Sequence, residues 1–290
     1  MTPDCIWIVT PPGYLHSAAF DETALALNGA FADLGHVVPI VRDATEVRGV
    51  PLVLGANLLV DLPVAQHPER MVLYNLEQVQ PGSPWMRPGY IELLARHDVW
   101  DYSTDNIAAL GALGVRGVRH CPIAYHPALT RIRPAEESID VLFIGSLNER
   151  RSALLHQLVL HGLDVKALFG VYGVERDRMI ARSRILLNVH FYEAKVLELV
   201  RLSYWLANER FIVSEPGSDP GVRGELELGV AFAPYGELVA TCLRYARRPQ
   251  ERRAIARRGA QLFRLRDAAD VLRTVLTEPS TGRTPRASTT

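Results

Sequence analysis

The chain has 290 residues, of which 48% are hydrophobic and 22% are charged, and its 32 basic side chains balance its 32 acidic ones. This balance leaves no global field that would attract nucleic acid or an anionic membrane. No apolar stretch approaches the length of a membrane span, and the first residues lack the basic region of a signal peptide, so we expect a cytoplasmic protein without a transmembrane segment. Its three cysteines lie far apart, which argues against a disulfide framework and against structural zinc.

The first half of the sequence alternates short apolar runs with segments of helical periodicity. A strand is predicted at residues 5–10, followed by a polar loop and a helix at 19–34 that ends before Gly35. Further strands are predicted at residues 37–41, 51–60, 71–76, 98–102 and 118–124. Continuous apolar strands that alternate with amphipathic helices are typical of a parallel sheet covered on both faces. We therefore expect an N-terminal Rossmann-like domain at residues 1–130.

The pattern repeats after residues 125–140, which contain two prolines, several charges and little periodicity and are predicted to be a linker. Apolar strands beginning near Val141, Val165, Arg184 and Phe211 alternate with helices, and three more helices follow at 237–247, 250–263 and 268–276. This predicts a second Rossmann-like domain at residues 139–276. The tail, residues 277–290, has too little apolar material to fold.

Polar side chains follow two of the strands in this second half, each time just before a helix. Free backbone N–H groups and the positive end of the helix dipole lie at such positions, so a phosphate or diphosphate is the expected ligand. The residues after the first strand are Gly145, Ser146, Arg150 and Arg151, and those after the third are His190, Tyr192, Glu193 and Lys195. Lys195 is one of only two lysines in the chain, which indicates either a specific contact with phosphate or a bias of composition towards arginine.

Several segments resemble bacterial group 1 glycosyltransferases, including CgeB-like members. They are VLFIGSLNERR, the run from ALFGVYGVERDR to RFIVSE, GVAFAPYGELVATCLRYARRPQERRAIARRG and, in the first half, YNLEQV and VWDYSTDNIAAL. The resemblance covers most of residues 70–263. It implies the GT-B fold, in which two α/β Rossmann-like domains with parallel sheets face each other across a cleft, and transfer of a sugar from a nucleotide-diphosphate donor bound by the C-terminal domain.

In this group an E-x7-E segment bridges a strand and a helix, and its second glutamate typically holds the donor ribose. Glu198 matches that second glutamate, whereas His190 stands where the first is expected, with Glu193 nearby. This departure leaves both retention and inversion open. Lys195 and Glu198 are three residues apart, so the resemblance implies a cation for phosphate beside a carboxylate for sugar hydroxyls. The alternative is an ordinary surface ion pair.

The N-terminal half is expected to face the acceptor, and it offers two candidate catalytic groups. His16 lies in the loop after the first strand, where an imidazole can act as a general base near neutral pH. Glu77 follows the strand that ends in VLYN and is the competing carboxylate. The structural alternatives are a surface histidine and a carboxylate that only binds a loop N–H.

Missing motifs narrow the reaction class. The chain has no D-x-D sequence, so we expect transfer without a metal and without a cofactor other than the donor. It also lacks G-x-G-x-x-G, Walker A and H-E-x-x-H sequences, which disfavours dehydrogenases, P-loop enzymes and zinc hydrolases. The acceptor is left open between a small molecule, a glycan and a protein. A non-catalytic GT-B-like protein that binds a nucleotide or serves as a scaffold is the alternative function.

Overall fold

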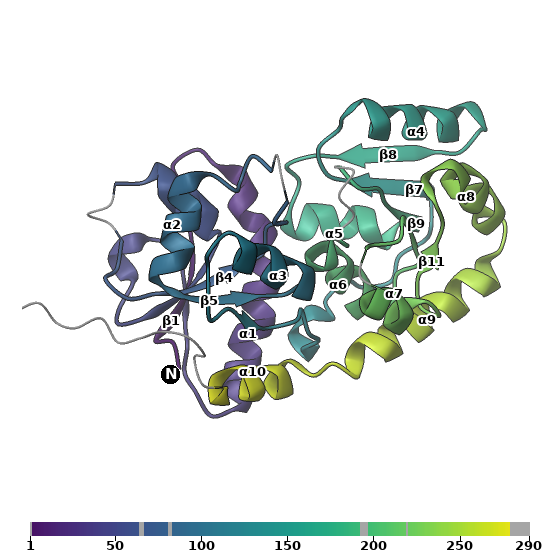
Figure 1. The fold of residues 1–290 in the computed structure, drawn as a ribbon. Helices are drawn as coiled ribbons and strands as arrows, with labels where there is room; N and C mark the ends of the chain where they lie inside the picture. Colours follow the sequence, from purple (N-terminus) through teal and green to yellow (C-terminus); the bar gives the residue numbers. More distant parts are fainter. Residues whose placement is uncertain (1, 64–66, 81–82, 192–196, 219, 279–290) are drawn as a thin grey trace, which may run out of the picture. The chain divides into compact units, whose positions relative to one another are not determined.

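The computed structural model describes residues 2–63, 67–80, 83–191, 197–218 and 220–278 (Figure 1). The chain forms two compact α/β units. Unit 1 contains Met1–Ile123 and the segment that begins at Ala268, and unit 2 contains Ala124–Asp267. Within the described ranges, no helix has the length and apolar character that a membrane crossing requires.

Unit 1 is built on a parallel sheet of six strands in the order β2-β1-β3-β4-β5-β6. The inner strands β1, β3 and β4 are buried at every position, as expected for a sheet covered on both faces. The strands are β1 (Cys5–Ile8), β2 (Ile40–Val41), β3 (Pro51–Leu54), β4 (Val72–Asn75), β5 (Asp98–Asp101) and β6 (Arg119–His120). The longer helices of this part of the chain are α1 (Asp21–Asp33), α2 (Pro88–Arg96) and α3 (Thr104–Ala112).

The apolar run at residues 51–60 is only partly a strand. β3 ends at Leu54, and the chain continues as a 3-10 helix, Ala56–Asp61. Between them Gly55 has a φ of 78°, and a Cβ atom there would lie 2.8 Å from the ring of Phe20. The prediction of a longer strand is therefore wrong after Leu54, because glycine allows a left-handed turn that apolar periodicity does not reveal.

Unit 2 contains a second parallel sheet, of five strands in the order β11-β10-β9-β7-β8. Its strands are β7 (Ile139–Ile144), β8 (Val165–Leu168), β9 (Ser183–Asn188), β10 (Ile212–Ser214) and β11 (Ala231–Phe232). Its helices are α4 (Glu149–Leu160), α5 (Gly173–Ala181), α6 (Leu199–Ala207), α7 (Pro220–Leu226), α8 (Leu238–Ala246) and α9 (Pro249–Arg264). The prediction of two α/β domains with parallel sheets is confirmed.

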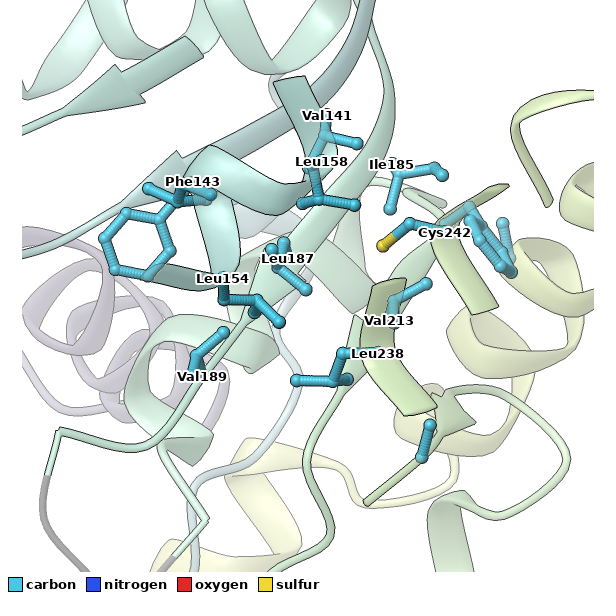
Figure 2. Packing of buried hydrophobic residues seen from close by; sticks show 14 residues of the cluster. Val141, Phe143, Leu154, Leu158, Ile185, Leu187, Val189, Val213, Leu238 and Cys242 are labelled. Carbon is cyan, nitrogen blue, oxygen red and sulfur yellow. The ribbon is translucent and has the colours of Figure 1, made fainter. Parts of the chain in front are cut away.

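The core of unit 2 explains why its strands read as continuous apolar runs. Val141 and Phe143 of β7 pack with Ile185 and Leu187 of β9 and with side chains of α4 and α8 (Figure 2). Leu142 lies between Val141 and Phe143 on β7, so its side chain points to the opposite face of the sheet. It is also fully buried. Both faces are therefore covered, which holds the carboxyl ends of the strands in fixed positions.

The helix α10 (Ala268–Thr277) belongs to unit 1, although the sequence places it directly after the second domain. It lies beside α1 (Figure 1), and its Leu272 and Val275 are buried. The Arg119 Nη1 atom donates a hydrogen bond to the carbonyl of Val275 at 3.0 Å. The predicted boundary at residue 276 differs from this arrangement because amphipathic periodicity shows that a helix needs a partner without showing which one.

The first residues of the predicted linker are bound to unit 2. The Tyr125 N–H donates to the carbonyl of Arg266 at 2.8 Å. The Asn208 side chain, at the end of α6, accepts hydrogen bonds from the N–H groups of Arg131 and Ile132, each at 2.8 Å. The chain passes between the units at 123/124 and again at 267/268. Residues 279–290 of the predicted tail lie outside the described part of the chain.

Candidate functional site

Three neighbouring strands of unit 2, β10, β9 and β7, run parallel and therefore end at the same edge of the sheet. Charged side chains from the strand ends and from the first turns of α4 and α6 meet at this edge. We call them the charged cluster: Arg150, Arg151, His190, Glu198, Arg201 and Glu215. Four of these residues were predicted as ligand-binding groups, and Arg201 and Glu215 were not.

Gly145 forms the turn that leaves β7 beside this cluster. Its φ is 149°, a conformation that favours glycine, and its N–H donates to the carbonyl of Leu168 at 2.9 Å. A Cβ atom at this position would lie 3.3 Å from Nη2 of Arg201 and 3.5 Å from Nη1 of Arg151. The glycine thus allows the backbone to approach two guanidinium groups closely.

Arg150 is held by protein acceptors on one side of the cluster. Its Nη1 atom donates to the carbonyl of His190 at 3.1 Å and to Oε2 of Glu215 at 2.7 Å, and its Nη2 atom contacts the other oxygen of the same carboxylate. The guanidinium also lies 3.9 Å from the ring centroid of Tyr235. The Glu215 carboxylate is largely removed from water, with 4% of its side chain exposed, whereas 32% of the Arg150 side chain is exposed.

Arg151 is more deeply buried, with 3% of its side chain exposed. Its Nε and Nη2 atoms both donate to the carbonyl of Val189, at 2.9 and 2.5 Å, and its Nη1 atom donates to the carbonyl of Ser146 at 2.8 Å. Burial, followed by the charge of Arg201, lowers the pKa of Arg151 to about 10. Arg151 therefore fixes the ends of β7 and β9 to each other, and Ser146 takes part through its backbone.

Glu198 lies at the N-terminus of α6 and faces His190. Its Oε2 atom is 3.1 Å from Nδ1 of His190, with the geometry of an ion pair rather than of an aligned hydrogen bond. Burial alone would raise the pKa of Glu198, but His190, Arg201 and Asn188 lower it to about 2. Burial would likewise lower the pKa of His190, whereas the carboxylate of Glu198 raises it. The Nε2 atom of His190 is 3.1 Å from the carbonyl oxygen of Pro216, so both ring nitrogens face protein atoms.

Arg201 is the cation that the sequence interpretation missed. Asn188 connects it to Glu198, because the Asn188 Nδ2 atom donates to Glu198 at 2.9 Å while its Oδ1 atom accepts from Nη1 of Arg201 at 3.1 Å. Burial, only partly offset by the charge of Glu198, lowers the pKa of Arg201. Its position three residues after Glu198, on the first turn of a helix, was the available signal.

Replacement of His190 by Gln should change how stability depends on pH. The raised pKa of His190 means that its stabilising contribution is complete below the usual value of 6.5 and is lost as the pH rises through the folded-state pKa. Urea unfolding at several pH values between 6 and 9 should therefore show wild type losing stability relative to His190→Gln. His161→Gln is the control, because His161 is exposed on unit 2. Parallel curves for wild type and His190→Gln would contradict a charged His190.

Three of the predicted ligand-binding residues, Tyr192, Glu193 and Lys195, lie outside the described residues. The predicted pairing of Lys195 with Glu198 therefore stays a prediction. Glu198 itself is not on an open surface, because only 14% of its side chain is exposed and its described partners are Arg151, His190 and Asn188.

The two catalytic candidates of the N-terminal half lie in unit 1, and Tyr14 connects them. The rings of Tyr14 and His16 pack edge to face with centroids 5.4 Å apart. Burial and the charge of Glu77 raise the pKa of Tyr14. Glu77 follows the end of β4, and burial raises the pKa of its carboxyl group to about 7. His16 is half-buried on a 3-10 helix, Leu15–Phe20. Among the described residues, no group of histidine, cysteine and acidic side chains is arranged to hold a metal ion.

No family model matches the chain, and its curated relatives are uncharacterised proteins of Acanthamoeba polyphaga mimivirus. Protein L140 is 26% identical over 186 residues, which are 60% of this chain and 58% of L140. Protein L138 is 36% identical over 103 residues, 34% of this chain and 12% of L138. The match thus spans little more than half of the length of L140 and a small part of the length of L138. The resemblance to CgeB-like members stays a prediction.

Solved structures match most of the chain at low sequence identity. The structure of Anabaena Alr3699/HepE in complex with UDP and glucose gives a TM-score of 0.66 at 10% identity, covering 95% of this chain and 98% of that protein. AviGT4, a glycosyltransferase involved in avilamycin A biosynthesis, gives a TM-score of 0.57 at 14% identity, and the match covers 93% of this chain and 91% of AviGT4. Sucrose-phosphate synthase from Thermosynechococcus elongatus gives a TM-score of 0.51 at 12% identity, and the match covers 91% of this chain and 78% of the synthase. The two parallel-sheet α/β units of this chain therefore have the GT-B glycosyltransferase fold.

Proposed function

We propose that the protein is a glycosyltransferase that moves a sugar from a nucleotide-diphosphate sugar to an acceptor, with the donor bound at the charged cluster of unit 2. The observation that carries this proposal is an excess of positive charge in this cluster, in which Arg151 is deeply buried and Arg150 and Arg201 are partly exposed. Within the described residues, the cluster contains three guanidinium groups, two carboxylates and a histidine whose pKa is raised. Uncompensated buried charge is costly, so an anion is expected to complete the site.

A diphosphate suits this position for two reasons. The turn at Gly145 brings the backbone beside Arg201, and α4 begins directly after it with Asn148 as its N-cap. Backbone N–H groups at a helix start favour phosphate oxygens. The HepE structures, which contain UDP or UDP-glucose, give this proposal its support from a protein of similar fold. Glu198 would then face the nucleoside and sugar.

Positive charge for the departing diphosphate would come from arginine, so transfer is proposed not to require a divalent metal. Calorimetry with UDP, GDP, ADP and dTDP in EDTA tests this. At least one nucleotide should bind, and at a hundredfold excess over its dissociation constant it should stabilise the protein by about 2.7 kcal/mol in thermal unfolding. Failure of all four to bind would overturn the donor site. Binding without hydrolysis or transfer of any nucleotide sugar would favour the non-catalytic alternative.

A further inference from the structure

The segment that forms α8 and α9 is strongly basic, although the chain as a whole carries no net charge. Residues 238–265 contain eight arginines and a single acidic residue, Glu251. The carboxylate of Glu251 is shared by Arg244 and Arg248, whose guanidinium nitrogens lie 3.2 and 2.7 Å from its oxygens. This part of unit 2 therefore has a local excess of positive charge that its own acidic residue does not balance.

Four exposed arginines of this segment have no partner among the described residues. They are Arg247, Arg253, Arg257 and Arg258. The last three are exposed on α9, whose other side is buried and packs on α6 (Figure 1). On an ordinary solvated helix surface such charges are balanced locally, as Asp270 balances Arg273 on α10. The unbalanced arginines of α9 instead indicate a surface that receives negative charge from outside the chain.

Two leucines lie within this charged surface and are mostly exposed, Leu265 at 82% and Leu228 at 60%. Leu265 follows Arg258 by seven residues, which is about two helical turns, so both lie on the same side of α9. Leu228 precedes Gly229, which approaches α9 so closely that a Cβ atom on Gly229 would lie 2.3 Å from Cα of Gly259. Leu228 therefore lies beside the turn of α9 that carries Arg258. We call these residues the basic face: Leu228, Arg253, Arg257, Arg258 and Leu265.

Acidic side chains near α9 do not cancel the charge of the basic face. Glu209 pairs with Arg264 at 3.2 Å, and Glu225 of α7 pairs with Arg266. Glu227 is exposed and has no partner among the described residues. Its single negative charge stands against the three unpaired arginines, so the surface remains positive.

We infer that the basic face docks unit 2 on an anionic phospholipid surface. Guanidinium groups bind lipid phosphates there, and exposed leucines enter the boundary between headgroups and acyl chains. Single-stranded nucleic acid fits this surface less well, because its bases stack on exposed aromatic rings. The aromatic residues of the segment are engaged elsewhere: Tyr245 packs on Phe211 with ring centroids 4.8 Å apart, and Phe263 is 5% exposed.

The test is co-sedimentation of the full chain with sucrose-loaded vesicles made of equal parts phosphatidylserine and phosphatidylcholine. The protein should sediment with these vesicles and not with vesicles of phosphatidylcholine alone. Binding should weaken when the salt concentration rises from about 0.1 M to about 1 M, because the Debye length falls from about 10 to about 3 Å. The triple variant Arg253→Gln, Arg257→Gln and Arg258→Gln should bind about a hundredfold more weakly, at about fivefold for each arginine.

The matched control is the triple variant Arg116→Gln, Arg133→Gln and Arg178→Gln. It removes the same charge from exposed positions outside the basic face and should bind the vesicles nearly as wild type does. Leu265→Ser tests the apolar contact, and it should weaken binding at both salt concentrations because burial of a leucine is not screened. Thermal unfolding checks that each variant is folded, which is expected because the substituted side chains are exposed.

The possible results separate lipid docking from the alternatives. Absence of sedimentation with the phosphatidylserine vesicles at low salt, or equal losses in the two triple variants, would overturn the inference. Tighter binding to a single-stranded RNA than to the vesicles, unchanged in Leu265→Ser, would also overturn it and assign the basic face to nucleic acid. Neither result affects the proposed donor site, because the basic face contains none of the residues of the charged cluster.

Discussion

Glu198→Ala is expected to lower both the stability of the protein and its affinity for nucleotide. The folded-state pKa of Glu198 is about 2 against an ordinary value of 4.5, which corresponds to about 3 kcal/mol of unfolding free energy at pH 7. Because the folded-state pKa is lowered, this contribution is present above the ordinary value and is lost as the pH falls towards 2. Removing the carboxylate also leaves Arg151 and Arg201 without their nearest described counter-charge.

The loss of affinity follows from the proposed contact with the nucleoside. A charged acceptor contributes about 1.5–3 kcal/mol per hydrogen bond, so the dissociation constant should rise about tenfold to a hundredfold. Urea unfolding and calorimetry measure the two effects separately. Glu251→Ala is the control for stability, because Glu251 pairs with Arg244 and Arg248 on an exposed face and should matter little. Nucleotide affinity equal to wild type in a folded Glu198→Ala protein would leave Glu198 with a structural role only.

Glu77→Gln should reduce turnover by about 10²–10⁴ while nucleotide affinity stays nearly unchanged, since a general base contributes about this much to a rate. Glutamine keeps the size of the side chain and removes its ability to accept a proton. The measurement is steady-state kinetics with an identified donor, beside calorimetry with the nucleotide alone.

His16→Ala, measured in parallel, decides between the two candidate bases of unit 1. We expect the larger decrease in kcat for Glu77→Gln, because the Glu77 carbonyl accepts hydrogen bonds from the buried side chains of Asn75 and Asn106, whereas the ring of His16 packs on Tyr14. A decrease in kcat confined to His16→Ala would reverse the assignment. Loss of nucleotide binding in His16→Ala would place the first loop in the donor site and contradict the proposed division between the units.

The two sheets could be predicted because apolar strands buried on both faces leave a clear pattern of short continuous runs. Details of the fold that depend on a single residue or on a distant partner could not be predicted from this pattern. Gly55 ends β3 within an apolar run, and α10 packs on α1, more than two hundred positions earlier in the chain. Periodicity shows which face of a helix is apolar, but the partner of that face is determined by three-dimensional packing.

The candidate donor site was predictable to a similar extent. Gly145, Arg151, His190 and Glu198 come together because parallel strands place their exits at one edge. Their roles were less accessible, since the hydrogen bonds of Arg151 to two backbone carbonyls depend on how the strand ends are oriented. Glu215 is the last residue of an apolar run and Arg201 is three positions after Glu198, so both had a signal in their spacing that the sequence interpretation did not use.

The position of α10 determines the order in which the protein can be completed during synthesis. Unit 2 is one continuous segment, Ala124–Asp267, whereas unit 1 needs a helix that follows it in the chain. A ribosome therefore releases every residue of the C-terminal unit before the N-terminal unit has its last helix. Until then the face of α1 that packs against α10 is uncovered, and the nascent N-terminal unit is the one that requires protection from aggregation.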